Sequence, residues 1–155
     1  MITLAIARHA DADWGAPSLP DHERPLSARG RRDAPRIARV LGEQGFRPDR
    51  LISSTALRAR ETATVFATEL DLALEQDDRL YGAGPDTLLA VAEQSGSKNV
   101  LLVAHDPGLS TLAYALTDTI SAMPAGAVAR FTWNARSWPE ALSEAPASWT
   151  FDQPR

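Results

Sequence analysis

The sequence predicts an α/β fold, a three-layer α/β/α sandwich around a mostly parallel sheet. Short apolar segments alternate with longer amphipathic segments along the 155 residues, which is the pattern of strands and helices that build such a sandwich. The segment NVLLVAHD, residues 99–106, is an unbroken apolar run of the kind that lies centrally in a parallel sheet. The length suits one core rather than two, so we expect a single domain over residues 1–155.

The first elements follow from local signals. Residues 3–8 are short and apolar and are typical of a buried strand. Residues 9–26 are rich in Asp, Pro and Gly, which predicts a long loop. Ser27 is placed to cap a helix that runs to about Gln44 and stops at Gly45.

The next elements repeat this order. Pro35 deprives the first helix of one hydrogen bond, and we expect a bend there. A second strand is predicted over residues 50–54 and a second helix over residues 56–70. The apolar inner face of this helix is expected to consist of Ala63, Phe66, Ala67 and Leu70.

The second half of the chain continues the alternation. We predict a short strand over residues 73–76, a helix from Pro85 to Gly96 and another helix over residues 107–116. Two strands at or near the sheet edge are predicted over residues 126–133 and 148–152. Core packing is the expected use of the aromatic residues near the C-terminus, with an interface as the alternative. These are Trp133, Trp138, Trp149 and Phe151.

Composition excludes several classes of protein. The chain has no cysteine, which rules out disulfides and thiolate chemistry. A net charge of −4 argues against a general nucleic-acid binder. We find no apolar run near the roughly 20 residues that span a membrane and no pattern typical of a signal peptide. We therefore expect a cytoplasmic protein with neither a nucleic-acid nor a membrane partner.

Polar side chains follow three of the predicted strands where each strand ends. Arg8 ends the first strand and His9 comes directly after it, and His105 and Asp106 follow the central strand. Arg58 lies at the start of the helix after the second strand. Because ligands of open α/β sheets bind beyond the carboxyl ends of the strands, we expect these side chains to meet there.

Two histidines with nearby arginines favour phosphoryl chemistry. Arginine binds phosphate oxygens through two parallel hydrogen bonds, and a neutral imidazole can attack phosphorus to form a covalent intermediate. A metal site that uses Asp11, Asp13 and Asp106 is the competing interpretation, but two adjacent guanidinium groups oppose a cation. We expect His22 to be a surface residue. The arginines expected to form a solvated helix face are Arg29, Arg31, Arg32, Arg36 and Arg39.

Three motifs in order resemble the histidine phosphatase superfamily. They are RHA after the first strand, SSTALRARETA at the second and VLLVAHDPGLS at the third. The segment ARHADAD…DHERPLSARGRRDA is most similar to the SixA-type phosphohistidine phosphatases. The resemblance implies the phosphoglycerate mutase-like fold of branch 1 of that superfamily. It also implies that His9 is the nucleophile, that Arg8 and Arg58 bind phosphate, and that His105 contacts the phosphoryl oxygens. Such enzymes use no metal or other cofactor.

The sequence departs from the superfamily pattern at one important position. Many members carry a glutamate general acid shortly after the segment that here reads RLYGAG, where Gly82 and Ala83 stand. The candidates for a replacement proton donor are Asp11, Asp13 and Asp106. The favoured substrate is phosphohistidine on a protein, whose labile P–N bond needs less help from an acid. A small phosphorylated metabolite and a non-catalytic phosphate-binding regulatory module remain alternatives, and the oligomeric state stays open.

Overall fold

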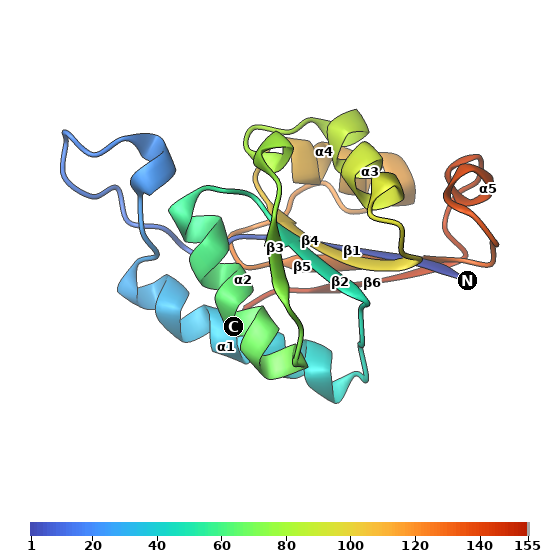
Figure 1. Ribbon diagram of the computed structural model, residues 1–155, viewed down its shortest axis with the longest axis horizontal. Helices are drawn as coiled ribbons and strands as arrows, with labels where there is room; N and C mark the ends of the chain where they lie inside the picture. The colour runs from blue at the N-terminus through green and yellow to red at the C-terminus, as the bar shows by residue number, and fades with distance from the viewer. Residues whose placement is uncertain (155) are drawn as a thin grey trace.

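The structure is a computed structural model in which residues 1–154 are described. In this part of the chain the strands form one six-stranded sheet in the order β3-β2-β4-β1-β5-β6 (Figure 1). The strands are β1 (Ile2–Arg8), β2 (Arg50–Ser53), β3 (Leu74–Gln76), β4 (Asn99–Ala104), β5 (Val128–Trp133) and β6 (Ser148–Asp152). β3, β2, β4 and β1 are parallel, whereas β5 is antiparallel to β1 and β6 is antiparallel to β5. The predicted α/β class and mostly parallel sheet are confirmed.

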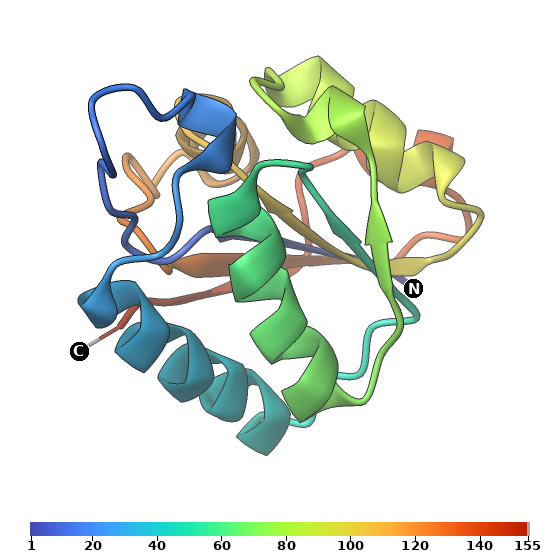
Figure 2. The same cartoon turned by 60° about the vertical axis from the view of Figure 1, so that its left-hand side comes forward.

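Helices cover both faces of the sheet, which gives the three layers (Figure 2). α1 (Ala28–Glu43) and α2 (Leu57–Leu70) pack on one face. The other face carries α3 (Pro85–Gln94), α4 (Gly108–Thr117) and the short α5 (Trp138–Leu142). The apolar side chains of β1 and β4 alternate between the two cores, since Leu4 and Ile6 lie in one and Ala5 in the other.

The start of α1 is fixed against the loop that follows β1. Ser27 caps the helix, because its side chain accepts a hydrogen bond from the backbone N–H of Gly30 at 3.0 Å. A Cβ atom on Gly30 would lie 2.1 Å from the carbonyl oxygen of Asp11, so only glycine permits this close approach. Pro35 lies inside α1, as expected.

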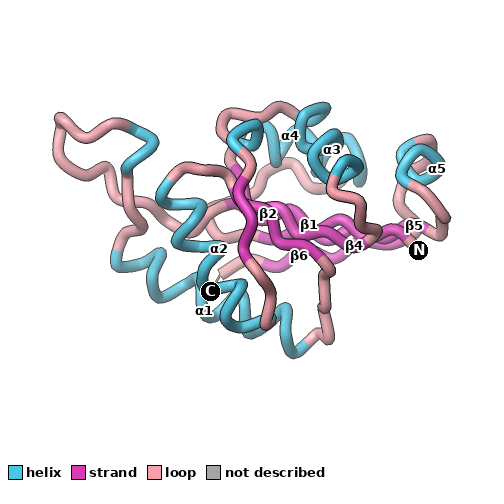
Figure 3. Tube along the Cα trace, viewed as in Figure 1, coloured by secondary structure: helices cyan, strands magenta, loops and turns pink. Residues whose placement is uncertain are grey.

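The long loop between β1 and α1 extends beyond the sheet (Figure 3). It contains the 3-10 helix η1 (Asp21–Glu23), and Ala12 pairs with Leu26 in an isolated bridge across its base. A second 3-10 helix, η2 (Asp78–Leu80), follows β3. Within the described residues, no helix is long and apolar enough to cross a membrane.

One expectation needs correction, and one short helix was not predicted. Trp133 and Trp138 are buried and Phe151 is half-buried against the same core, as expected, but Trp149 is 38% exposed on the edge strand β6. Ala67 of the predicted inner face of α2 is half-buried and packs against the core, as expected. α5 was not predicted, since five residues are too few to show a helical period.

The arginines of α1 are exposed, as expected for a solvated helix face. Two of them lie beside the buried Asp33. Its carboxylate is 3.5 Å from Arg29 and 4.0 Å from Arg36.

Candidate active site

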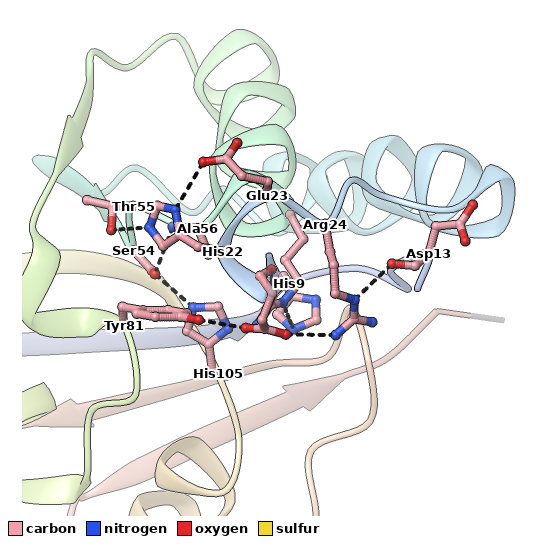
Figure 4. Close-up of polar contacts among 12 residues, drawn as sticks. His9, Asp13, His22, Glu23, Arg24, Ser54, Thr55, Ala56, Tyr81 and His105 are labelled. Atoms are coloured by element: carbon pink, nitrogen blue, oxygen red, sulfur yellow. Dashed lines mark hydrogen bonds and ion pairs between the residues drawn. The ribbon is translucent and has the colours of Figure 1, made fainter. Parts of the chain in front are cut away.

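The four residues expected to bind and attack phosphate come together at the carboxyl ends of the parallel strands. β1 and β4 are neighbours in the sheet, and Arg8 at the end of β1 pairs in register with Ala104 at the end of β4. The residues that follow, His9 and His105, therefore lie side by side, with ring centroids 5.2 Å apart (Figure 4). Arg58, in the first turn of α2, donates a long hydrogen bond of 3.4 Å to Nε2 of His9.

His9 is held in one tautomer. Its Nδ1 atom lies 2.7 Å from the carbonyl oxygen of Ala10, and a carbonyl can only accept, so Nδ1 carries the ring proton. Burial lowers the pKa of His9 to about 4, and the positive charges of Arg58 and Arg8 add to this effect against the opposing Ala10 hydrogen bond. The imidazole is therefore neutral near pH 7, and its Nε2 atom keeps the lone pair that an attack on phosphorus needs, held only by the long hydrogen bond from Arg58.

A buried threonine fixes the backbone that holds His9. The hydroxyl of Thr62, in α2, accepts a hydrogen bond from the backbone N–H of Ala10 at 3.0 Å. The same hydroxyl donates to the carbonyl oxygen of Arg58 at 2.9 Å. Thr62 thus ties the backbone of Ala10, whose carbonyl oxygen sets the His9 tautomer, to the helix turn that carries Arg58.

His105 is neutral as well. Its Nε2 atom lies 2.7 Å from the hydroxyl of Ser54. Burial lowers the pKa of His105 to about 3, and the positive charge of Arg58 acts in the same direction. The Nδ1 atom of His105 is buried and has no hydrogen-bond partner among residues 1–154. A buried ring nitrogen of this kind is suited to bind a ligand atom.

The two predicted arginines are positioned differently. The guanidinium of Arg8 donates to the carbonyl oxygen of Met123 at 2.9 Å and lies 3.6 Å from Asp106. Its Nε atom is buried and has no partner among the described residues. Arg58 is buried, and its two terminal nitrogens bind Asp21, one at the carbonyl oxygen at 2.8 Å and one at the carboxylate at 3.1 Å.

Three residues of the site were missed in the sequence. The carboxylate of Asp21 accepts hydrogen bonds from the Tyr81 hydroxyl at 2.6 Å, from Arg24 at 3.1 Å and from Arg58. The bond from Tyr81 is the main reason that the pKa of Asp21 lies far below its usual range. Asp21 and Arg24 stand in the quoted DHERPLS segment, but nothing local shows that Tyr81 lies beside them.

His22 is also more than a surface residue, which corrects the expectation. It is partly buried, and its Nε2 atom lies 2.8 Å from the hydroxyl of Thr55. Its ring packs edge-on against Tyr81, whose ring in turn packs edge-on against His105 (Figure 4). His22 therefore attaches the long loop to the wall of the site.

The three carboxylates named as proton donors occupy different places. Asp11 lines the cleft and accepts a hydrogen bond of 2.7 Å from the Ser27 hydroxyl. Asp106 lines the cleft too, but it binds the backbone N–H and hydroxyl of Ser110 at the start of α4. Asp13 is exposed and bonded to the backbone N–H of Gly15 at 3.2 Å, outside the cleft lining.

These side chains surround a cleft of about 310 Å³. It is lined by Arg8, His9, Asp11, Ala12, Trp14, Arg24, Arg58, His105, Asp106 and Ala125. Three arginines and two neutral histidines make it a site for an anion such as a phosphoryl group. Among the described residues, no group of three or more His, Asp or Glu side chains is arranged to hold a metal ion.

The family model described as "Histidine phosphatase superfamily (branch 1)" matches residues 4–82, from Leu4 within β1 to Gly82 directly after Tyr81. The chain belongs to the histidine phosphatase superfamily. Its match to an uncharacterized chloroplastic protein of Arabidopsis thaliana is 31% identical and covers 70% of this chain but only 50% of that protein. An uncharacterized protein of Mycobacterium tuberculosis is 35% identical over 70% of this chain and 68% of its own length.

Solved structures of superfamily members agree with the SixA-like resemblance. A protein of Agrobacterium tumefaciens assigned as the phosphohistidine phosphatase SixA superimposes with a TM-score of 0.82 and 26% identity over 99% of both chains. The protein histidine phosphatase SixA in complex with tungstate superimposes with a TM-score of 0.74 and 25% identity over 98% of this chain and 95% of that chain. A mycobacterial glucosyl-3-phosphoglycerate phosphatase shares the fold. It superimposes with a TM-score of 0.67 and 18% identity over 98% of this chain and 97% of that chain. Membership of this histidine phosphatase group supports phosphatase activity.

Proposed function

We propose that the protein is a metal-independent phosphatase that forms a phosphohistidine intermediate on His9. The single observation that carries this proposal is the His9 tautomer, because the Ala10 carbonyl holds the ring proton on Nδ1 and leaves Nε2 unprotonated. In the first step the Nε2 lone pair forms an N–P bond and the bond to the leaving group breaks. In the second step water attacks phosphorus, the N–P bond breaks and inorganic phosphate is released.

The surroundings of His9 supply what this reaction needs. Arg8 Nε is a buried donor without a partner among the described residues. When the Ser54 hydroxyl donates to Nε2 of His105, the ring proton lies on Nδ1, which is then a second buried donor without a partner in this part of the chain. Together with Arg58 they can stabilise the negative charge of the transferring phosphoryl group. Of the proton-donor candidates, Asp11 and Asp106 line the cleft.

The favoured substrate is phosphohistidine on a protein. Residues at and beside the mouth of the cleft are exposed, with Trp14 at 80% and Tyr81 at 40%. A phosphoryl group displayed on a protein surface can reach such a site. The SixA structures described above support the same substrate class, and a cytoplasmic location fits it. A small phosphorylated metabolite is the alternative substrate.

Replacement of His9 tests the mechanism. His9→Ala is expected to abolish phosphate release from a phosphohistidine peptide and from p-nitrophenyl phosphate, together with acid-labile ³²P labelling of the protein. Chelator should leave the wild-type rates unchanged. Labelling that persists in the folded His9→Ala variant would overturn the assignment of the nucleophile. Turnover that stops on addition of chelator would overturn the metal-independent reaction.

A further inference from the structure

Asp21 is an anion placed beside a site for anions. Its carboxylate is 51% exposed on the loop between β1 and α1, and Arg58 bridges it to His9. Negative charge next to a bound phosphoryl group weakens phosphate binding. We therefore expect the carboxylate of Asp21 to have a role other than phosphate binding.

The contacts of Asp21 leave it able only to accept hydrogen bonds. Tyr81 and Arg58 donate to one carboxylate oxygen and Arg24 donates to the other. These donors keep the pKa of Asp21 far below its usual range, so the group is ionised at neutral pH. An ionised carboxylate carries no proton to give to an alcohol leaving group.

Phosphohistidine presents a complementary leaving group. One imidazole nitrogen carries the phosphoryl group, and the other carries a proton when the ring is positively charged. A ring protonated in this way leaves as neutral imidazole, whereas an unprotonated ring leaves as an unstable anion. A carboxylate that binds this N–H favours the protonated ring and hence the cleavage of the P–N bond.

On the basis of the proposed function, we propose that Asp21 binds the free ring N–H of the substrate phosphohistidine and selects P–N over P–O substrates. The Nε2 lone pair of His9 forms the new N–P bond. The electron pair of the broken P–N bond stays on the leaving nitrogen, and the proton stays on the other ring nitrogen, bound to Asp21. No proton has to move to the leaving group, which agrees with the absence of glutamate at Gly82 and Ala83.

Tyr81 and Arg24 are positioning residues for Asp21. The Tyr81 ring packs edge-on against His105 at 5.6 Å between centroids, so its hydroxyl fixes the carboxylate relative to the second histidine. Arg24 also donates through its Nε atom to the carbonyl oxygen of Asp13 at 2.9 Å, which ties the two arms of the loop together. The carboxylate is thereby held on the side of the site where Tyr81 borders His105.

The test compares two substrates on two variants. Asp21→Asn removes the charge, and Glu23→Gln is the matched control, since Glu23 is exposed on the same 3-10 helix and pairs with His22 at 3.5 Å. The ratio of kcat/KM for a phosphohistidine peptide to kcat/KM for p-nitrophenyl phosphate is the readout. We expect Asp21→Asn to lower this ratio at least tenfold, Tyr81→Phe to lower it less, and Glu23→Gln to leave it unchanged.

The outcomes separate this inference from the function on which it rests. A folded Asp21→Asn variant that loses both activities in parallel would show that Asp21 only orders Arg58, and would overturn the inference alone. A wild-type protein that hydrolyses p-nitrophenyl phosphate but not the phosphohistidine peptide would overturn the proposed substrate. Thermal unfolding of each variant confirms that the ratios refer to folded protein.

Discussion

Replacement of Thr62 by valine probes the support of the His9 tautomer without touching the cleft. Thr62 is fully buried, and its hydroxyl links the Ala10 N–H to the Arg58 carbonyl oxygen. Valine has nearly the same shape but can neither accept nor donate. The change therefore removes both hydrogen bonds and leaves the N–H of Ala10 without its partner.

The expected cost follows from these two bonds. An unpaired buried N–H costs about 1–3 kcal/mol, and the methyl group that replaces the hydroxyl regains less than about 1 kcal/mol. We expect the free energy of unfolding to fall by about 1–2 kcal/mol. Because the carbonyl oxygen of Ala10 holds Nδ1 of His9, a shift of the Ala10 backbone misplaces the nucleophile, and we expect kcat to fall roughly 10-fold.

The assay combines urea denaturation with turnover of p-nitrophenyl phosphate, and Thr64→Val is the control. Thr64 is exposed on the same helix, where its hydroxyl bonds the carbonyl oxygen of Arg60 at 2.8 Å. Its replacement should change stability by less than about 0.5 kcal/mol and leave kcat unchanged. Equal losses of stability in the two variants, or a Thr62→Val enzyme within twofold of wild-type kcat, would refute this reasoning.

Two further predictions concern pH and backbone packing. The pKa values of His9 and His105 are lowered to about 4 and about 3, so the unfolded chain binds more protons below pH 6.5. Stability should then fall as the pH drops from 6.5 toward 4, and urea midpoints that stay flat over this window would contradict the buried neutral histidines. A Cβ on Gly108 would lie 1.9 Å from the carbonyl oxygen of Ala83, whereas one on Gly84 meets nothing within 4 Å. Gly108→Ala should thus cost about 1–3 kcal/mol and Gly84→Ala less, by urea denaturation, and equal costs would count against the close approach.

The sequence was sufficient to predict the site residues that lie at or directly after the ends of strands. Arg8 ends β1, and His9 and His105 come directly after β1 and β4, whose apolar runs and parallel arrangement were predictable. The carboxyl ends of parallel strands lie at one edge of the sheet, where ligands bind. The pairing of β1 with β4 then brings the two histidines together. Arg58 was predictable for a related reason, because the helix that carries it starts directly after β2.

The loop residues could not be predicted in the same way. Asp21 and Tyr81 are 60 positions apart, and their 2.6 Å hydrogen bond depends on how η1 folds back over the site. No hydrophobic period describes such a loop, since its path is set by tertiary contacts. His22 was misjudged for that reason, because a histidine in a polar segment shows nothing of the Thr55 hydroxyl that binds it.

The distribution of protons in the site favours one class of leaving group. Asp21 accepts from Tyr81, Arg24 and Arg58, and Asp106 accepts from the N–H and hydroxyl of Ser110. Asp11 accepts from the Ser27 hydroxyl. Hydrolysis of a phosphate ester needs a proton delivered to the departing oxygen. A carboxylate can carry such a proton only after it loses hydrogen bonds that it now accepts. Protonated phosphohistidine brings its own proton, so a site rich in arginine and poor in proton donors is matched to a P–N bond.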